Sequence, residues 1–292
     1  MLSIIICSIS PERLQNIKQN IEDTIGVDYE LIAIDNRVNN WPIARVYNEG
    51  ARQARYPYLF FVHEDVIFHN SGWGKAIEEK LDEPDCGVIG FAGSKVMTDC
   101  YSGWGQYNYH WHSAYYFFAN DGVTVDLEAY NVKLKEPYDP VVVVDGFAFF
   151  VRRDVWAQCP FDEALLTGFH CYDIDFSLQV GQKYRNYVCG LDIKIEHLSA
   201  GNFSSSWVLD TIRLYDNKWK QMLPLKTDDV RMSSKAYRKN KEELCYRFLF
   251  KALRTDVPRK LKKQLLNSFW QRPFTWRHFT HCLSCTLKYL RS

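Results

Sequence analysis

Short runs of β-branched and aromatic residues alternate with amphipathic helical patterns through the first 95 residues, and this alternation restricts the fold more than any other feature. The predicted strands are Leu2 to Ile6, Glu30 to Ile34, Tyr58 to Val62 and Val88 to Phe91, with helices around residues 11–21, 43–54 and 73–81 between them. Strands that alternate with helices usually form a parallel sheet covered on both faces. The predicted class is therefore α/β, with a mostly parallel central sheet and helices on both faces.

Polar residues follow three of the predicted strands. They are Ser8, Asp35 and the acidic cluster His63-Glu64-Asp65 in the segment FVHEDVIF. Unpaired charge in an apolar core costs several kcal/mol or more, so these side chains should lie outside the core. The carboxyl ends of parallel strands share one edge of a sheet, which is where ligands bind in such folds. The sequence therefore predicts a ligand site at this edge.

Three more polar groups follow or precede apolar runs in the second half of the chain. The run Val141 to Val144 is predicted to be a strand that leads into Asp145-Gly146, and another predicted strand ends at Glu196-His197. Asp173 and Asp175 begin a predicted helix. Acidic residues in a first turn suit the helix dipole, so simple N-terminal stabilisation is an alternative to a catalytic role for both.

The segment from 95 to 140 is irregular and rich in aromatic residues, and such a long loop is usually functional or mobile. Trp104, Tyr107, Trp111 and Tyr115 could stack on sugar rings or fill a core. His110 and His112 alternate as on a strand, so they could bind a metal or could be partly exposed bystanders.

Composition limits the class of protein further. The chain of 292 residues is 47% hydrophobic, enough for a large core, yet it has no window near the ~18–20 apolar residues of a membrane span. The start MLSIIICSIS has no basic region and no cleavage site, and we interpret it as a buried strand. A cytoplasmic protein is expected, and its nine scattered cysteines are predicted to be reduced and mostly buried.

The net charge of +1 hides two oppositely charged segments. Residues 1–212 contain 16 basic and 29 acidic residues, a net charge of −13, whereas residues 213–292 contain 20 and 6, a net charge of +14. This asymmetry predicts a domain from 1 to 212 and a basic, mainly helical extension from 213 to 292.

The extension combines apolar stripes with basic residues. Leu261, Leu265, Leu266 and Phe269 form one stripe, and Trp270, Phe274, Trp276 and Phe279 are candidate interfacial aromatics. Such helices could dock on an anionic membrane, pack on the acidic domain or form an oligomer contact. On the last helix His278, His281, Cys282 and Cys285 share one face with metal-ligand spacing, for which packing is the favoured interpretation.

Seven segments in order resemble the family 2-like glycosyltransferases of the GT-A fold, in the branch with a His-x-Asp signature. They are LSIIICSIS, ELIAIDN, ARVYNEGARQA, FFVHEDVIF, VDGFAFFVRRDVW, FDEALLTGFHCYDIDFSL and IEHLSAG, and they cover roughly residues 2 to 210. The resemblance implies a GT-A type nucleotide-binding fold and transfer of a sugar from a nucleotide-sugar donor to an acceptor hydroxyl. It also implies a glycan or lipid-linked acceptor in surface polysaccharide synthesis, with no nucleic-acid partner.

The resemblance implies donor-binding roles for several residues. Ser8 would lie near the nucleotide, Asp35 would bind the base, and Arg45 and Asn48 would contact the donor. Glu64 belongs to the segment that takes the place of the family's Asp-x-Asp motif.

The resemblance also implies a divalent metal, Mn²⁺ or Mg²⁺, on the donor diphosphate. Asp65 would be the main ligand, and His197 could complete the site. His63 departs from the family's first aspartate; it could be a ligand, a ribose or phosphate contact, or a packing residue. Imidazole suits Mn²⁺ better than Mg²⁺.

The remaining implied roles concern the sugar and the base. Asp145 and Gly146 would lie on the sugar and acceptor side, and Asp173 would be the catalytic base, with Asp175 as the other candidate carboxylate. A carboxylate suits this task because inverting transfer needs a proton acceptor opposite the leaving group.

Other classes fit the sequence less well. A dinucleotide-binding oxidoreductase needs G-x-G-x-x-G after the first strand, and a nucleotidyltransferase usually needs a Gly-rich basic loop there; SISPERL is neither. A glycosidase with two carboxylates would not explain Ser8 and Asp35 at strand ends. A catalytically silent GT-A protein that binds carbohydrate or nucleotide is the alternative that remains.

Overall fold

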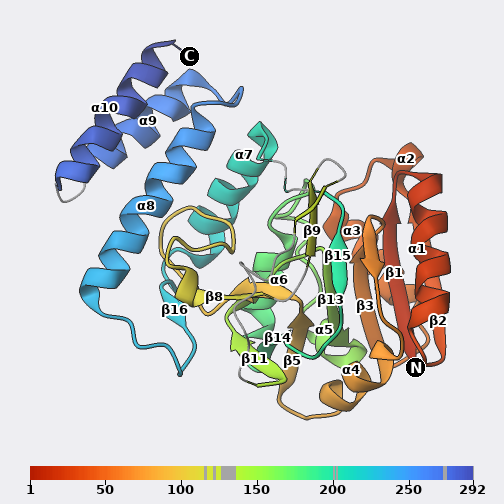
Figure 1. Ribbon diagram of the computed structural model, residues 1–292. Coiled ribbons are helices and arrows are strands. Elements are labelled where there is room, and N and C mark those ends of the chain that lie inside the picture. Colours follow the sequence, from red (N-terminus) through yellow and green to blue (C-terminus); the bar gives the residue numbers. More distant parts are fainter. Residues whose placement is uncertain are drawn as a thin grey trace.

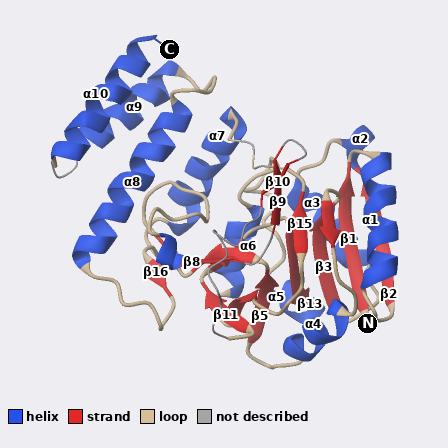
Figure 2. Cartoon of the chain, in the orientation of Figure 1, coloured by secondary structure: helices blue, strands red, loops and turns tan. Residues whose placement is uncertain are grey.

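A seven-stranded sheet forms the centre of the protein in the computed structural model, which describes residues 1–114, 117–120, 123–125, 136–199, 201, 203–271 and 275–291 (Figures 1 and 2). Its strands, in spatial order, are β11 (Tyr138–Val141), β14 (Arg185–Cys189), β5 (Cys86–Gly90), β13 (Ala148–Arg152), β3 (Tyr58–His63), β1 (Leu2–Ser8) and β2 (Tyr29–Asp35). Strands β2, β1, β3, β5 and β14 run in one direction, and β13 and β11 run in the other. The predicted mostly parallel sheet is confirmed.

Helices cover both faces of this sheet because successive strand residues point to opposite sides. Ile4 and Ile6 pack under α1 (Pro11–Thr24) and α4 (Trp73–Leu81), whereas Ile5 packs on the opposite face. The helices of that opposite face are α3 (Ile43–Gln53), α5 (Arg153–Gln158) and α6 (Tyr172–Val180). The short α2 (Asn36–Asn39) follows β2. The sheet thus contributes to two hydrophobic cores.

Smaller sheets lie beside the carboxyl edge of the main sheet. One has the order β10 (Val123–Val125), β9 (Phe117–Asn120), β15 (Ile195–His197) and β4 (Val66–Phe68). Another has the order β12 (Val143–Val144), β6 (Ala92–Ser94) and β8 (His112–Ala114), and β16 (Leu225–Lys226) pairs with β7 (Val96–Met97). A 3₁₀ turn, Tyr109–Trp111, precedes β8.

One predicted strand is wrong in its extent. The run Val141 to Val144 is divided between two strands in different sheets, because β11 pairs with β14 and β12 pairs with β6. Val142 lies at the division; its N–H donates to Ser94 O (2.8 Å) and its carbonyl accepts from Asn186 Nδ2 (3.0 Å). An apolar run does not reveal which neighbour each residue will pair with.

The C-terminal part is helical, as predicted. Helix α7 (Ser205–Leu214) continues into a π-helical turn, Tyr215–Trp219, and α8 (Ser234–Ala252), α9 (Arg259–Trp270) and α10 (Trp276–Arg291) follow. Figure 1 shows these last three helices packed together at one end of the protein, on the side away from β2. None of the described helices has the length and apolarity needed to cross a membrane.

Packing between the sheet and the helices continues across the predicted boundary between residues 212 and 213. Tyr215, Trp219 and Leu223 are buried in the core beside α3, α5 and α6. Farther on, Phe248 of α8 packs on Trp207 of α7. The division at 212 remains a prediction, and the packing favours a later position.

The predicted apolar stripe on α9 lies inside the helical unit. Leu266 and Phe269 are buried against Leu249, Cys282 and Cys285. The imidazole of His278 is also buried, with Nε2 2.8 Å from Phe269 O and its ring stacked on Phe269. These contacts support the packing interpretation of the His and Cys residues of α10. Phe274 falls outside the described residues.

Candidate active site

The carboxyl edge of the main sheet collects the predicted polar residues. Strands β1, β2 and β3 are parallel, so Ser8, Asp35 and His63 at their ends are neighbours. Strand β13 runs the opposite way, so the residues before it, Asp145 and Gly146, reach the same edge from the other direction. A hydrogen bond joins the end of β3 to the segment before β13, because the N–H of His63 donates to Phe147 O (2.8 Å).

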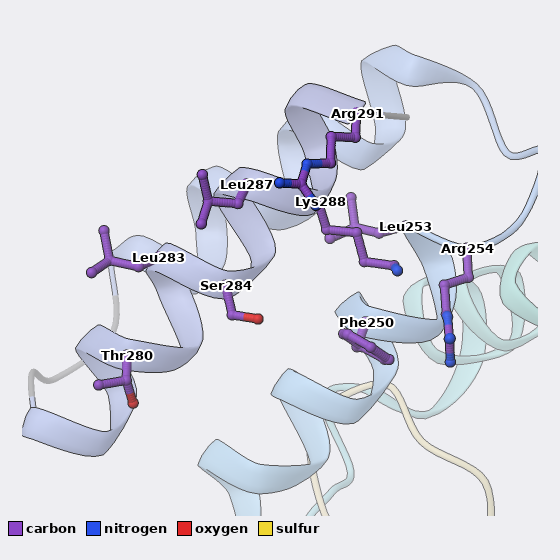
Figure 3. Close-up of a pocket in the computed structure, with 9 residues that line it drawn as sticks. All are labelled: Phe250, Leu253, Arg254, Thr280, Leu283, Ser284, Leu287, Lys288 and Arg291. Carbon is purple, nitrogen blue, oxygen red and sulfur yellow. The ribbon is translucent and has the colours of Figure 1, made fainter.

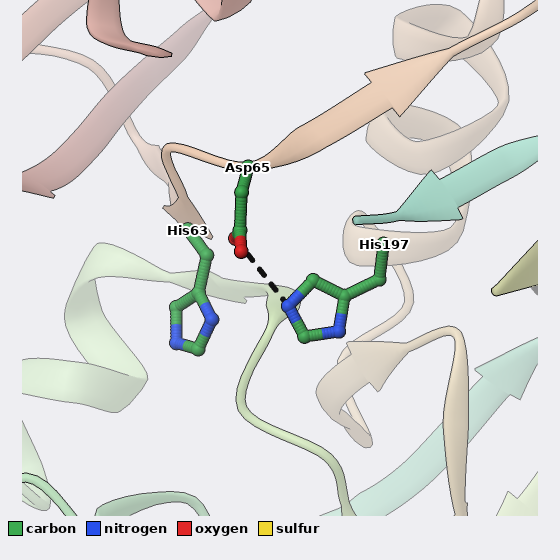
Figure 4. Close-up of side chains that lie close together, drawn as sticks. All are labelled: His63, Asp65 and His197. Atoms are coloured by element: carbon green, nitrogen blue, oxygen red, sulfur yellow. Dashed lines mark ion pairs between the residues drawn. The ribbon is translucent and has the colours of Figure 1, made fainter. Parts of the chain in front are cut away.

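His63, Asp65 and His197 form a compact cluster at this edge (Figure 4). Strand β15 pairs antiparallel with β4, and the N–H of Leu198 donates to Asp65 O (2.9 Å), which places His197 beside Asp65. His197 Nε2 lies 3.4 Å from Asp65 Oδ1, and one potential ligand atom from each of the three residues lies within 4.8 Å of the others. Among the described residues this is the one group of His, Cys, Asp and Glu with such spacing. The structure thus brings together the three predicted metal ligands.

Tyr172 fixes the orientation of His63. The Tyr172 hydroxyl donates to Gly146 O (2.9 Å), so Nε2 of His63, 2.8 Å away, carries a proton and donates to the same hydroxyl. Nδ1 of His63 then keeps its lone pair, as a metal ligand requires. Burial lowers the pKa of His63 to about 4, with the neighbouring His197 acting in the same direction, which favours the neutral form.

Asp65 is held as a carboxylate. Burial raises the pKa of the Asp65 carboxyl, but the hydrogen bond and charge of His197, together with Ser199 and His63, outweigh burial and hold the pKa below its usual range. Arg13 at the start of α1 lies 4.0 Å away on the exposed side. The group is therefore anionic when a cation arrives.

The residues fit a divalent ion. Two imidazoles and one carboxylate suit Mn²⁺ better than Mg²⁺. An ion with bonds of about 2.2 Å spans up to about 4.4 Å between two ligands, so a small inward shift of these side chains would complete the coordination. Three protein ligands would leave positions for substrate oxygens.

Asp173 lies next to this cluster, at the start of α6. Its Oδ2 accepts the N–H of Gly146 (3.0 Å), and Trp104 Nε1 donates to Asp145 on the other side of the same turn. Burial raises the pKa of Asp173, and the nearby Asp145 raises it further; burial also raises the pKa of Asp145, which His197 partly offsets. A carboxylate whose pKa is raised can act as a base nearer neutral pH.

Gly146 is needed at this turn because of close packing. A Cβ there would lie 2.3 Å from Tyr172 Oη and 3.0 Å from Asp173 Cβ. Any side chain at position 146 would therefore displace both Tyr172, which orients His63, and the candidate base Asp173.

Glu64 is outside the metal-ligand cluster and holds the loop after β1. Its carboxylate accepts hydrogen bonds from Ser8 Oγ (2.7 Å) and from the N–H groups of Ile9 and Ser10 (both 3.2 Å to Oε2). Ser10 in turn caps α1. Glu64 and Ser8 are thus close to the edge where a donor would bind, and their contacts shape that edge.

Two predicted donor contacts are exposed beside the same edge. Asp35 is paired with Arg37, whose hydrogen bonds lower the pKa of Asp35 to about 2. Arg45 on α3 stacks over the Trp41 ring at 4.2 Å. Both side chains are accessible to a ligand.

Asn48 and Asp175 lie apart from the metal cluster, each in a complete hydrogen-bond network. The Asn48 amide donates to Phe161 O and Glu163 and accepts from Trp156 and the N–H of Phe161. Asp175 is fully buried and accepts from Lys218 (2.9 Å), Trp219 (2.8 Å) and Gln179 (2.8 Å). The structure does not bring either side chain to the candidate base or the metal ligands.

The aromatic residues of the segment from 95 to 140 have different surroundings. Trp104 lies at the site through Asp145, whereas Trp111 is buried in a small core with Val96 and Val230. Tyr107 lies under the cations of Arg247 and Arg277, and Tyr115 falls outside the described residues.

The two histidines of this segment are not together in a metal cluster. His112 Nε2 lies 2.7 Å from the backbone O and N of Gln106, and His110 is exposed.

Sequence reasoning missed the residues that support the site. Tyr172 orients His63, Phe147 stacks on His197 with ring centroids 4.9 Å apart, and the exposed Phe169 lies 5.7 Å from the His63 ring. Tyr172 precedes Asp173 in the chain, and Phe147 follows Gly146. Their positions next to predicted site residues were the one feature of the sequence that could have identified them as part of the site.

The fold is that of the GT-A glycosyltransferases. A structure of GalNAc-T7 with UDP, GalNAc and Mn²⁺ is similar, with a TM-score of 0.53 and 11% identity over 82% of this chain; the chain spans about half, 54%, of the GalNAc-T7 chain. A structure of S. aureus TarS 1–349 with UDP matches with a TM-score of 0.45 and 12% identity, over 93% of this chain and 71% of that one. Comparison with curated proteins gives no match.

The sequence itself carries the family assignment. Residues 3–221 match the glycosyltransferase-like family, and the chain belongs to that family. The resemblance predicted from the sequence is confirmed at this level, and the His-x-Asp branch remains a prediction.

Proposed function

We propose that the protein is an inverting, divalent-metal-dependent glycosyltransferase that moves a sugar from a nucleotide-diphosphate sugar to an acceptor hydroxyl. The observation that carries the proposal is the link between the metal-ligand cluster and the base: Tyr172 and Gly146 connect His63 to Asp173 at one sheet edge. The presence of UDP and Mn²⁺ with the similar GalNAc-T7 supports the donor class.

Each group at the edge has a role in this proposal. His63, Asp65 and His197 would hold Mn²⁺ or Mg²⁺, which when bound supplies Lewis-acid stabilisation of the departing diphosphate. Asp173 accepts the proton of the acceptor hydroxyl, and the N–H of Gly146 holds its carboxylate in place. Asp35 at the end of β2 and Arg45 on α3, both exposed, contact the nucleotide, while Asp145 and Trp104 border the sugar.

The acceptor is a glycan or a lipid-linked glycan in polysaccharide synthesis under the same proposal. An acceptor of this kind would bring the protein to the inner face of a membrane from the cytoplasm. Peripheral contact of residues 213–292 with an anionic membrane is part of this proposal.

A catalytically silent binding protein is the second candidate. It would bind a nucleotide sugar without needing a base. The carboxyls of Asp145 and Asp173 are half-buried and close enough for Asp145 to raise the pKa of Asp173, and such arrangements are more typical of catalytic sites than of passive ones. The carboxyl pair therefore favours the enzyme.

Calorimetry with UDP-, GDP- and dTDP-sugars, with and without Mn²⁺, tests the proposal together with a hydrolysis assay. We expect donor binding to depend on Mn²⁺ and to be lost in Asp65→Ala. Asp173→Asn should keep donor binding and lose about 10²–10⁴-fold in turnover, as expected for loss of a general base. Asp154→Asn is a matched control, because Asp154 is exposed at the opposite end of β13.

The outcomes separate the two candidates. Mn²⁺-dependent binding with no turnover of any donor by the unmodified protein would support the silent binder. Equal donor affinity in Asp65→Ala and the unmodified protein, with and without Mn²⁺, would refute the metal site.

A further inference from the structure

Helix α10 has apolar residues on two faces, and only one of these faces is buried. Cys282 and Cys285 are packed against α8 and α9. The other face exposes Trp276 (76%), Leu283 (44%), Leu287 (57%) and Leu290 (65%). We call these four residues the α10 outer face. Large apolar side chains gathered on one exposed stripe usually mark an interaction surface.

The surroundings of this face are basic. Residues 257–292 contain eight Lys and Arg residues and no Asp or Glu. A groove of about 790 Å³ runs between the end of α8 and α10, and Arg254, Lys288 and Arg291 are among the residues that line it. Figure 3 shows Leu283 and Leu287 pointing away from α8, while Lys288 reaches toward Phe250, its Nζ 4.9 Å from the ring centroid.

We infer that the α10 outer face binds the surface of an anionic lipid membrane. The helix lies along the surface with Trp276, Leu283 and Leu287 at the boundary between headgroups and acyl chains. Lys288 and Arg291 lie beside them, where anionic headgroups would pair with their charge. An apolar stripe with Trp and flanking cations is the pattern of interfacial helices.

The structure places this surface differently from the sequence pattern. The stripe on α9 that includes Leu266 and Phe269 is used for packing inside the helical unit, so it is not available to lipid. The exposed stripe belongs to α10 instead. This assignment rests on the membrane contact that is part of the proposed function and locates it on a defined face of one helix, and vesicle binding can be measured independently of catalysis.

Shape and charge favour lipid over a second copy of the chain. Four side chains spread over 15 residues form a strip of about 21 Å along the helix. Stable protein interfaces usually involve about 20–30 residues on each side. Residues 257–292, which include α9 and α10, contain no acidic residue, so these two helices could not pair their charges with the same helices of a second copy.

Vesicle co-sedimentation of the full chain tests the inference. We expect binding to phosphatidylcholine vesicles that contain phosphatidylglycerol, weaker binding at high salt, and little binding to pure phosphatidylcholine. The double variant Leu283→Asp/Leu287→Asp should reduce vesicle affinity by at least about tenfold, because two large apolar side chains are replaced by charged ones that resist transfer out of water. Lys288→Gln/Arg291→Gln should lose up to about 30-fold, and its residual binding should depend less on salt.

The matched control is Met222→Asp, an equally drastic change at an exposed apolar residue outside α8, α9 and α10. It should bind vesicles as the unmodified chain does. Circular dichroism and thermal melting confirm that each variant is folded. Vesicle binding that is absent in the unmodified chain, or unchanged in Leu283→Asp/Leu287→Asp, overturns the inference. A dimer in sedimentation velocity that this double variant disperses, without vesicle binding, would assign the face to a second copy.

Discussion

Asp145 and Asp173 are half-buried close to one another, and this proximity should govern the pH dependence of transfer. The base must be deprotonated, and burial together with the charge of Asp145 raises the pKa of Asp173. The acidic limb of kcat/KM should therefore lie above the value of about 3.9 for a free aspartate, with activity falling as the pH drops through the raised pKa.

The prediction is tested with Asp145→Asn. This variant removes the neighbouring negative charge, so the acidic limb should move to lower pH even if the rate itself falls. The measurement is the pH profile of kcat/KM for the unmodified chain and the variant. A limb that stays in place, or moves to higher pH, would show that Asp145 does not set the pKa of the base.

The candidate metal ligands illustrate what could be predicted residue by residue. Asp65 and His197 are 132 positions apart, yet both follow or end apolar strands; the resemblance predicted that they share a metal site, and the structure brings the two side chains together. The role of Glu64 could not be predicted in this way. Glu64 lies in the turn between β3 and β4, and its hydrogen-bond donors, Ser8 and the N–H groups of Ile9 and Ser10, lie 54 to 56 residues away in the chain.

The amide of Asn48 links helix α3 to α5 and to the segment before α6. Its partners, Trp156, Phe161 and Glu163, lie 108 to 115 residues away in the chain, so no local pattern could reveal them. The resemblance placed Asn48 at the donor, whereas the structure gives it a place in the packing between elements.

The variant Asn48→Ala distinguishes these roles. It leaves buried donors of Trp156 and Phe161 without their acceptor, so we expect a loss of about 2–4 kcal/mol in unfolding free energy. Donor affinity of the folded protein should stay the same. Urea denaturation and calorimetry measure the two effects; weakened donor binding at unchanged stability would instead make Asn48 a donor contact.

The whole molecule is less divisible than its charge distribution suggests. The switch from acidic to basic composition predicted a boundary near residue 212, but Tyr215 and Trp219 fill the core of the large sheet. Lys218 of the same turn pairs with the fully buried Asp175 of α6. Charged residues mostly lie on the surface, so the charge pattern of a sequence does not show where a hydrophobic core ends.

Truncation tests this reading of the boundary. A chain of residues 1–212 should fail to unfold cooperatively, because removing large buried side chains costs about 3–5 kcal/mol each and typical domains have only about 5–15 kcal/mol of stability. A chain of residues 1–224 keeps Tyr215, Trp219 and Leu223 and should melt cooperatively, below the full-length protein. Calorimetric scans of both chains decide, and equal cooperative transitions would restore the boundary at 212.

Separation of opposite charges gives the molecule a large electric dipole. The acidic sheet domain carries −13 at one end, and the segment that forms α8, α9 and α10 carries most of the +14 at the other. In the field of an anionic surface such a molecule experiences a torque that turns its helical end toward the surface before any contact is made. Orientation of this kind increases the rate of productive encounters, and ions in solution screen it within about 10 Å at 0.1 M salt.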